Sequence, residues 1–384
     1  MPLSRLLVFL GILTSVLFLV HLYVWFKVVR GAGFPPPWGR VATIVLFTLC
    51  ASIPLLFVLR DSAPRGISSA MAWVVYSWMG FLFYLFAFGL ISDALRGMAF
   101  LTGNFPQDPV RRSFLTRLLA GGVGAAALAT GLGGMLHVAR GFRIKNIRIP
   151  LAKLPTAADG YVIAQLTDVH VGPTIGRGFI EDVVRETNAL NPDLIAITGD
   201  LVDGTVDALR DAVAPLAGLK ARDGVYFVTG NHEYYSGADA WIAHLETLGI
   251  RVLRNERVDI RGLFDLAGVD DAKSAGMAPG HGQDVAKAMV GRDPAKAVVL
   301  LAHQPKSVLE AGLNGVDLQL SGHVHGGQIW PFTWLAHLDQ PYLHGLYHHG
   351  NTTIYVSQGT GYWGPPMRVG TTSEITRVEL AAAT

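Results

Sequence analysis

Five short clusters of Asp, Asn and His stand out because these side chains together could bind metal ions. Carboxylate oxygens and imidazole nitrogens are ligands for divalent transition metals, and one carboxylate can bridge two such ions. The set therefore predicts a site for two metals. The clusters are Asp168-Val169-His170, Gly199-Asp200-Leu201-Val202-Asp203, Gly230-Asn231-His232-Glu233, His303 and Gly322-His323-Val324-His325.

Each cluster follows a short apolar run, namely residues 163–166, 194–197, 225–228, 298–301 and 316–320. Runs of this length that are rich in Val, Ile and Leu are typical of buried strands. In open α/β sheets, ligands bind at the carboxyl ends of the strands. Five such strand ends are expected to bring the polar clusters to one place.

Helical and further strand patterns lie between these runs, so an α/β layered domain is expected. The alternation of apolar and polar residues over 142–149 predicts an edge strand. A Gly- and Pro-containing stretch over 271–284 predicts a mobile loop or lid, in which His281 could touch a substrate. Helices are expected at 178–190, 206–219 and 237–248, and hairpin strands at 252–255 and 263–268.

The first part of the 384-residue chain differs strongly in charge from the rest. Residues 1–145 contain 13 Lys and Arg against 3 Asp and Glu, whereas residues 146–384 contain 18 against 26. This asymmetry predicts a membrane module joined to a water-soluble domain and argues against a nucleic-acid-binding protein. The single cysteine, Cys50, excludes an intrachain disulfide.

Four apolar runs are about 20 residues long, the length that crosses a bilayer. The predicted spans contain no buried acid–base pair, which disfavours a transport function. We therefore expect a transmembrane region at 1–140, a connector at 141–157 and a catalytic domain at 158–384. The expected spans are residues 6–27, 41–59, 67–92 and 118–139.

The stretch from Arg111-Arg112 to Arg117 precedes the weakly apolar fourth run and resembles a twin-arginine export signal. Its internal position suggests an anchor that is retained. The alternative is an ordinary basic loop before a fourth span. Basic residues are balanced between the two sides, so only the export interpretation orients the chain. It places a multi-pass protein in the cytoplasmic (inner) membrane, with the catalytic domain on the outer (periplasmic or extracellular) face.

Taken in order, the five clusters resemble the motifs of the calcineurin-like metallophosphoesterases over roughly residues 158–380. The run 322–329, with residues 355–359 and 365–368, is similar to the membrane-anchored, twin-arginine-type branch of that family. A weaker similarity is to the UDP-2,3-diacylglucosamine hydrolases of lipid A synthesis. The resemblance implies a layered α/β/β/α sandwich preceded by a four-helix transmembrane region.

The same resemblance implies roles for individual residues. His232 would protonate the leaving oxygen or steady the phosphate, and Asp203 would hold its imidazole, although Asp203 could instead cap a helix. Glu233 would brace the loop through backbone hydrogen bonds. The cofactors would be two divalent ions such as Mn, Fe or Zn. The ligands would be Asp168, His170, Asp200 and His325 for one ion, and Asp200, Asn231, His303 and His323 for the other, with Asp200 bridging.

The sequence adds two expectations about the surroundings of the metals. His323 and His325 would point to the same side of an extended segment, so serving two ions requires a bend, which Gly322, Gly326 and Gly327 permit. Aromatic residues near the C-terminus could form either an apolar wall or part of the core. They are Trp330, Trp334 and Tyr362-Trp363. Arg368 could meet a phosphate or form a surface ion pair.

The expected function is that of a membrane-anchored binuclear phosphoesterase that hydrolyses a phosphodiester, phosphomonoester or pyrophosphate by attack of a metal-bridging hydroxide. Because the chain is anchored, a lipid-linked or membrane-proximal substrate is expected. Two alternatives stay open at this point. One is a UDP-2,3-diacylglucosamine-type pyrophosphatase, and the other is a non-catalytic membrane receptor built on a phosphatase fold.

Overall fold

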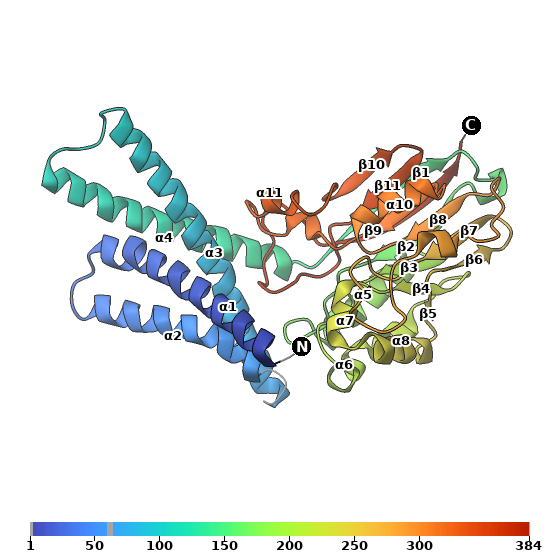
Figure 1. Cartoon of the computed structure of the whole chain (residues 1–384), viewed down its shortest axis with the longest axis horizontal. Helices are drawn as coiled ribbons and strands as arrows, with labels where there is room; N and C mark the ends of the chain where they lie inside the picture. Colours follow the sequence, from blue (N-terminus) through green and yellow to red (C-terminus); the bar gives the residue numbers. More distant parts are fainter. Residues whose placement is uncertain (1–2, 60–63, 384) are drawn as a thin grey trace. The chain divides into compact units, whose positions relative to one another are not determined.

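The computed structural model describes residues 3–59 and 64–383. Residues 1, 2, 60–63 and 384, which belong to the transmembrane region and the catalytic domain expected from the sequence, lie outside the described residues. The chain forms two compact units, which are described separately (Figure 1). One comprises residues up to 136 together with 364–367, and the other comprises 137–363 together with 368–384.

The first unit is helical. Four helices in the described residues are long and apolar enough to cross a membrane. Pro54 lies inside the second of them without ending it, as neighbouring groups can satisfy the freed carbonyl. The segments are α1 (Leu3–Val24), which continues as the π-helix η1 (Trp25–Arg30), α2 (Trp38–Leu59), α3 (Arg65–Leu101) and α4 (Pro109–Ala139).

The helices extend beyond the predicted spans, and this corrects one expectation. Helical structure continues to Arg30 after the first span and to Leu101 after the third. The added turns bring Lys27 and Asp93 together as a half-buried salt bridge. Asp93 lies one residue beyond the predicted third span and its side chain is 40% exposed, so this pair is not a buried acid–base pair within the predicted spans.

The second unit contains two six-stranded sheets. In the first sheet, β2, β3, β4 and β5 are parallel, and β12 pairs with β2 antiparallel and with β1 parallel. The alternating segment after α4 is thus an edge strand, as its pattern predicted. The order is β1 (Arg143–Leu151), β12 (Glu374–Ala382), β2 (Tyr161–Leu166), β3 (Leu194–Thr198), β4 (Val225–Val228) and β5 (Arg251–Val252).

In the second sheet, β7, β8, β9 and β11 are parallel, and the outer strands β6 and β10 are antiparallel to their neighbours. The hairpin expected from 252–255 and 263–268 is made instead by β6 and β7, because Asn255 turns the chain with φ of 52°. The order is β10 (Gly345–His349), β11 (Thr352–Val356), β9 (Leu318–Ser321), β8 (Val298–Leu301), β7 (Phe264–Gly268) and β6 (Glu256–Ile260).

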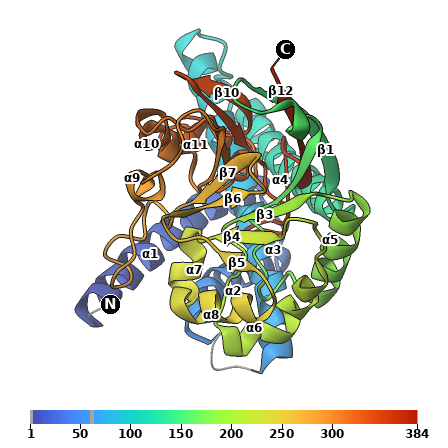
Figure 2. The same ribbon diagram turned by 90° about the vertical axis from the view of Figure 1, so that its right-hand side faces the viewer.

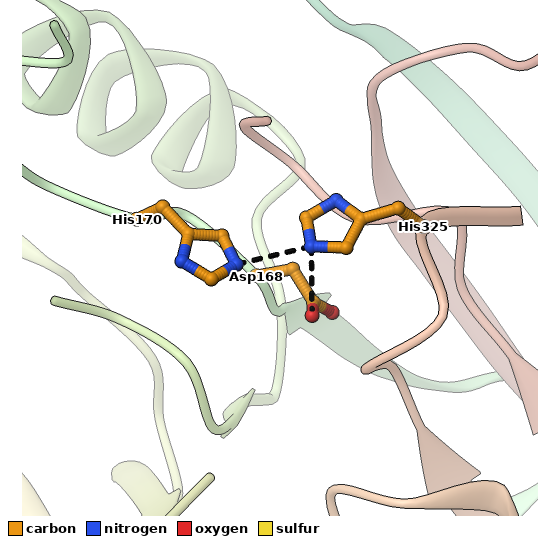
Figure 3. A group of neighbouring side chains, drawn as sticks. All are labelled: Asp168, His170 and His325. Atoms are coloured by element: carbon orange, nitrogen blue, oxygen red, sulfur yellow. Dashed lines mark hydrogen bonds and ion pairs between the residues drawn. The ribbon is translucent and has the colours of Figure 1, made fainter. Parts of the chain in front are cut away.

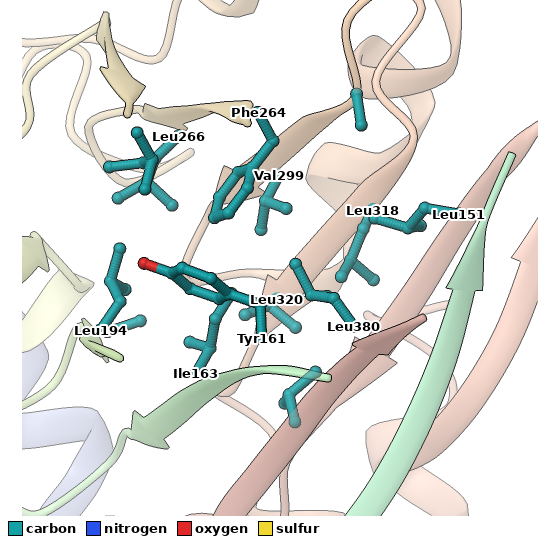
Figure 4. Packing of buried hydrophobic residues seen from close by; sticks show 14 of the residues in the cluster. Leu151, Tyr161, Ile163, Leu194, Phe264, Leu266, Val299, Leu318, Leu320 and Leu380 are labelled. Carbon is teal, nitrogen blue, oxygen red and sulfur yellow. The ribbon is translucent and has the colours of Figure 1, made fainter. Parts of the chain in front are cut away.

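The two sheets enclose the main core, to which Tyr161, Ile163, Phe264 and Leu320 contribute (Figure 4). Successive strand residues face opposite sides, so Leu166 belongs instead to the core beneath the helices on the outer face of the first sheet. Those helices are α5 (Arg177–Ala189), α6 (Val206–Val213) and α8 (Ala238–Thr247), and the other outer face carries α9 (Val285–Ala288) and α10 (Val308–Leu313) (Figure 2). The α/β/β/α layering is confirmed. Two short helices, α7 (Asn231–Ser236) and α11 (Thr333–Ala336), follow β4 and β9.

Candidate metal centre

The predicted ligands follow the carboxyl ends of strands from both sheets. The loops after β2, β3 and β4 come from the first sheet, and those after β8 and β9 come from the second. Among the described residues, these loops form three groups of Asp and His whose ligand atoms lie within 4.8 Å of one another. The expectation that five strand ends converge is therefore confirmed.

The first group joins Asp168, His170 and His325 (Figure 3). The Nε2 atom of His325 lies 3.4 Å from Oδ1 of Asp168 and 3.0 Å from Nε2 of His170. All three side chains are buried. Two imidazole nitrogens and a carboxylate oxygen thus point at one small volume.

The second group joins Asp200, His303 and His323. The Nε2 atom of His303 lies 3.0 Å from Oδ2 of Asp200 and 3.2 Å from Nδ1 of His323. The other ring nitrogen of His303 lies 2.8 Å from the carbonyl oxygen of Thr198. This contact orients the ring and directs Nε2 at the carboxylate, as outer hydrogen bonds do for metal-bound histidines.

Asp200 also takes part in a third group, with His170 and His232, and so lies between the first two. Close by, the buried Oδ1 atom of Asn231 has no hydrogen-bond partner. A buried oxygen left without a partner is costly unless a ligand completes it. The donor set of carboxylate oxygens and imidazole nitrogens, together with this oxygen, fits two divalent metal ions that share Asp200.

The backbone is strained at the same residues. Nine non-glycine residues in the described chain have positive φ, and five of them are predicted ligands: Asp168, His170, Asp200, His323 and His325. Such conformations cost about 1–3 kcal/mol each and concentrate at functional sites. Gly326 and Gly327 also have positive φ, so the bend expected after Gly322 is present.

His232 lies beside the ligands with its ring held by a carboxylate. Its Nδ1 atom is 2.5 Å from Oδ1 of Asp203, and its Nε2 atom is 4.0 Å from Oδ2 of Asp200. Burial lowers the pKa of His232, but the two carboxylates outweigh it and raise the pKa to about 9. Asp203 does not cap α6, whose N-cap residue is Thr205.

The comparison with known proteins decides the family. The calcineurin-like phosphoesterase family matches residues 161–327. A transmembrane protein with metallophosphoesterase domain from Danio rerio is 35% identical, covering 98% of this chain and 89% of its own. This chain belongs to the calcineurin-like phosphoesterases. An uncharacterized metallophosphoesterase from Helicobacter pylori (strain J99) is 38% identical, covering 89% of this chain and 90% of its own.

The chain is therefore a metal-dependent phosphoester hydrolase that also carries membrane-spanning helices. Members of this family use two divalent metals, which agrees with the grouping of Asp and His side chains. The name of the relative from Danio rerio agrees with the four apolar helices of this phosphoesterase.

Glycines let the backbone of this phosphoesterase approach its carboxylates. A Cβ atom on Gly230 would lie 2.2 Å from Oδ1 of Asp200, and one on Gly322 would lie 2.1 Å from Oδ2 of Asp168. Because the backbone comes this close, the N–H groups of His232 and His323 donate to these same carboxylates at 2.9 Å. The two glycine positions thus fix the carboxylate orientations.

Glu233 braces the loops of the phosphoesterase, as predicted. Its fully buried carboxylate accepts hydrogen bonds from the backbone N–H groups of Asp200, Leu201 and Gly230, at 3.0, 2.8 and 2.6 Å. These bonds tie the loop after β3 to the loop after β4, and so fix Asp200 relative to Asn231.

Arg368 differs from both expectations, because it is only 1% exposed. It donates to the carbonyl oxygens of Gln358 and Gly361 at 2.7 Å, and its Nη2 atom lies 3.2 Å from Nδ1 of His325. Burial lowers its pKa to about 10, so it stays charged at neutral pH. Arg368 therefore supports the loops beside the metal centre.

The remaining predicted residues divide between the rim of the site and the interior. Tyr235 and Trp363 are exposed and flank His232, with ring centroids 5.3 and 5.6 Å from its imidazole. His281 is not placed to touch a substrate, because its buried ring contacts Asp239 and Tyr234. Of the aromatic pair considered from the sequence, Trp363 is exposed at this rim and Tyr362 is buried, whereas the sequence does not single out Tyr235.

Proposed function

We propose that this chain is a membrane-anchored binuclear phosphoesterase that hydrolyses a lipid-linked or membrane-proximal phosphoester, a phosphodiester, phosphomonoester or pyrophosphate. The observation that carries this proposal is the clustering of three groups of Asp and His, two of which share Asp200, within a chain that also has membrane-spanning helices. A non-catalytic receptor is disfavoured, because the chain contains all the carboxylate, amide and imidazole side chains expected to bind the two ions.

In this proposal, each ion takes four protein ligands and Asp200 serves both. When bound, the two ions would neutralise the phosphoryl oxygens and activate the attacking water. The short distances within each group support the division. One set is Asp168, His170, Asp200 and His325, and the other is Asp200, Asn231, His303 and His323.

His232 would then act on the oxygen of the leaving group. It is held by Asp203, which orients the imidazole so that it can protonate the departing alcohol or phosphate. Tyr235 and Trp363, whose rings lie 5.3 and 5.6 Å from its imidazole, would contact the leaving group and limit the access of water.

An exposed apolar segment supports a substrate at the membrane. Residues 330–338, which we call the aromatic segment, expose Trp334 by 68%, Leu335 by 57% and Leu338 by 84%. The segment continues directly from the loop of His323 and His325. Large exposed apolar clusters mark binding surfaces, and Trp favours the membrane–water interface. We infer that the segment enters the headgroup region and brings the metal centre to phosphates there.

The substrate class can be tested with the full chain in phosphatidylcholine vesicles containing Mn²⁺. The double variant Trp334→Ser, Leu338→Ser should hydrolyse a vesicle-borne lipid phosphodiester about thirtyfold more slowly, because about 2 kcal/mol of apolar burial is lost. Its rate on a soluble aryl phosphodiester should be unchanged. Release of the alcohol or phenol leaving group, measured on both substrates, gives the comparison.

The matched control is Leu309→Ser, Leu313→Ser, which removes two exposed leucines from α10. Equal lipid hydrolysis by both double variants would contradict a role for the aromatic segment. Turnover restricted to a UDP-linked acyl sugar would instead favour the pyrophosphatase alternative.

We further propose that the catalytic domain lies outside the cytoplasmic membrane, on the basis of the basic stretch 111–117. A reporter enzyme that works only in the periplasm, fused after the last residue, should be active in cells. Lys substitution of both Arg111 and Arg112 should abolish that activity if the stretch directs export. A fusion that is active only with a cytoplasmic reporter would overturn this orientation.

A further inference from the structure

The helical unit contains a small cavity between η1, α3 and α4, with a volume of about 170 Å³. Its polar lining is formed by Lys27, Ser92, Arg96 and Thr116, and its apolar lining includes Phe26 and Leu119. At about 30 Å³ for each water-sized group, it can hold a phosphate with its five heavy atoms. A cavity with this mixed lining suits an amphiphilic ligand better than a purely apolar one.

The charges around the cavity do not cancel. Asp93 is already occupied on both oxygens, because Lys27 pairs with Oδ1 and the Tyr23 hydroxyl donates to Oδ2 at 2.7 Å. The Arg96 guanidinium lies over the Phe105 ring at 5.8 Å and makes no ion pair with a carboxylate of the described helices. Asp108, the other described acid of these helices, accepts from the backbone N–H of Arg111. Among the described residues, Arg96 therefore has no carboxylate partner at the cavity.

The surroundings reinforce this positive charge. The α1–α2 and α3–α4 connections lie at the same end of the helical unit (Figure 1). That end carries seven basic residues: Lys27, Arg30, Arg40, Arg96, Arg111, Arg112 and Arg117. Basic pockets between membrane helices are typical sites for anionic headgroups. Lys27 also lies in the π-helix η1, a distortion frequently found at functional sites.

We propose that this cavity binds the phosphate of an anionic phospholipid. Arg96 and Lys27 hold the phosphate oxygens, the Ser92 hydroxyl offers a further hydrogen bond, and Phe26 and Leu119 contact the first carbons of the lipid. A lipid is favoured over free phosphate because the cavity is part of an apolar helical bundle. This site is separate from the metal centre and does not depend on the catalytic assignment.

The test measures binding of phosphatidylglycerol to the full chain in neutral detergent by native mass spectrometry. Arg96→Gln should weaken retention of one phosphatidylglycerol about tenfold, because a charge-assisted hydrogen bond is lost. The control Arg40→Gln removes an equal charge from the same end but outside the cavity, and should leave retention unchanged. Ser92→Leu keeps every charge but fills the cavity, and should also abolish the bound lipid.

The outcomes distinguish a lipid held in the cavity from surface attraction and from free phosphate. Equal weakening by Arg96→Gln and Arg40→Gln would show general surface attraction and would overturn the site. Absence of a retained lipid in the wild-type chain would do the same. If millimolar inorganic phosphate displaced the lipid completely, the occupant would be free phosphate and the lipid assignment would be wrong. Unchanged elution in size-exclusion chromatography shows that each variant has folded.

Discussion

Replacing Asp200 by Asn is expected to lower kcat/KM for an aryl phosphodiester by at least about a thousandfold, equivalent to ~4 kcal/mol of transition-state stabilisation. The amide has no negative charge to share between two cations, and Asp200 is the residue on which two of the ligand groups converge. Metal analysis of the purified variant should show about one ion or fewer per chain, against about two in the wild type.

The control for this experiment is Asp211→Asn, which removes an exposed carboxylate from the same unit. It should leave both turnover and metal content unchanged. A metal-loaded Asp200→Asn protein with a normal rate would sink the proposed bridging role. A variant that lost turnover but kept two ions would show that Asp200 is not needed to retain the metals and acts only through its charge in the transition state.

Replacing His232 by Gln should separate substrates by their leaving groups. A general acid contributes about 10²–10⁴-fold, and it contributes most when the departing oxygen is strongly basic. Hydrolysis of an alkyl phosphoester should therefore fall by about a thousandfold. Hydrolysis of a nitrophenyl ester, whose leaving group departs without a proton, should fall much less. Measuring kcat for the two esters gives the contrast.

Two further variants complete this comparison. Asp203→Asn removes the carboxylate that contacts the His232 ring and should produce the same leaving-group dependence in weaker form. His344→Gln, at an exposed histidine, should change neither rate. Equal losses on both esters in His232→Gln would assign His232 to phosphate binding instead of proton transfer.

The layered fold and the grouping of the ligands could be predicted from the sequence, because each cluster follows an apolar strand. The run 194–197 illustrates this. It predicts a buried strand that ends shortly before Asp200, which places Asp200 in the loop at the carboxyl end of that strand. The bend after Gly322 could also be predicted, because the glycines at 322, 326 and 327 permit positive φ.

Other features could not be predicted, because they depend on partners far away in the chain. Arg368 looks like a surface residue until the carbonyl groups of 358–361 are seen to surround it. The contact of Lys27 with Asp93 requires helices that continue past their apolar cores. The exposure of Trp334 depends on how the segment after β9 packs, and local composition does not specify this.

The position of β12 determines how the anchor is attached. In the described sheet, β1 pairs with β12 alone, and β12 pairs in turn with β2. Since β1 directly follows α4, mechanical load from a moving membrane would pass into the hydrolase through the pairing of these two strands. A chain that ended before Glu374 would lack β12, so β1 and the helices before it would no longer be hydrogen-bonded to the first sheet.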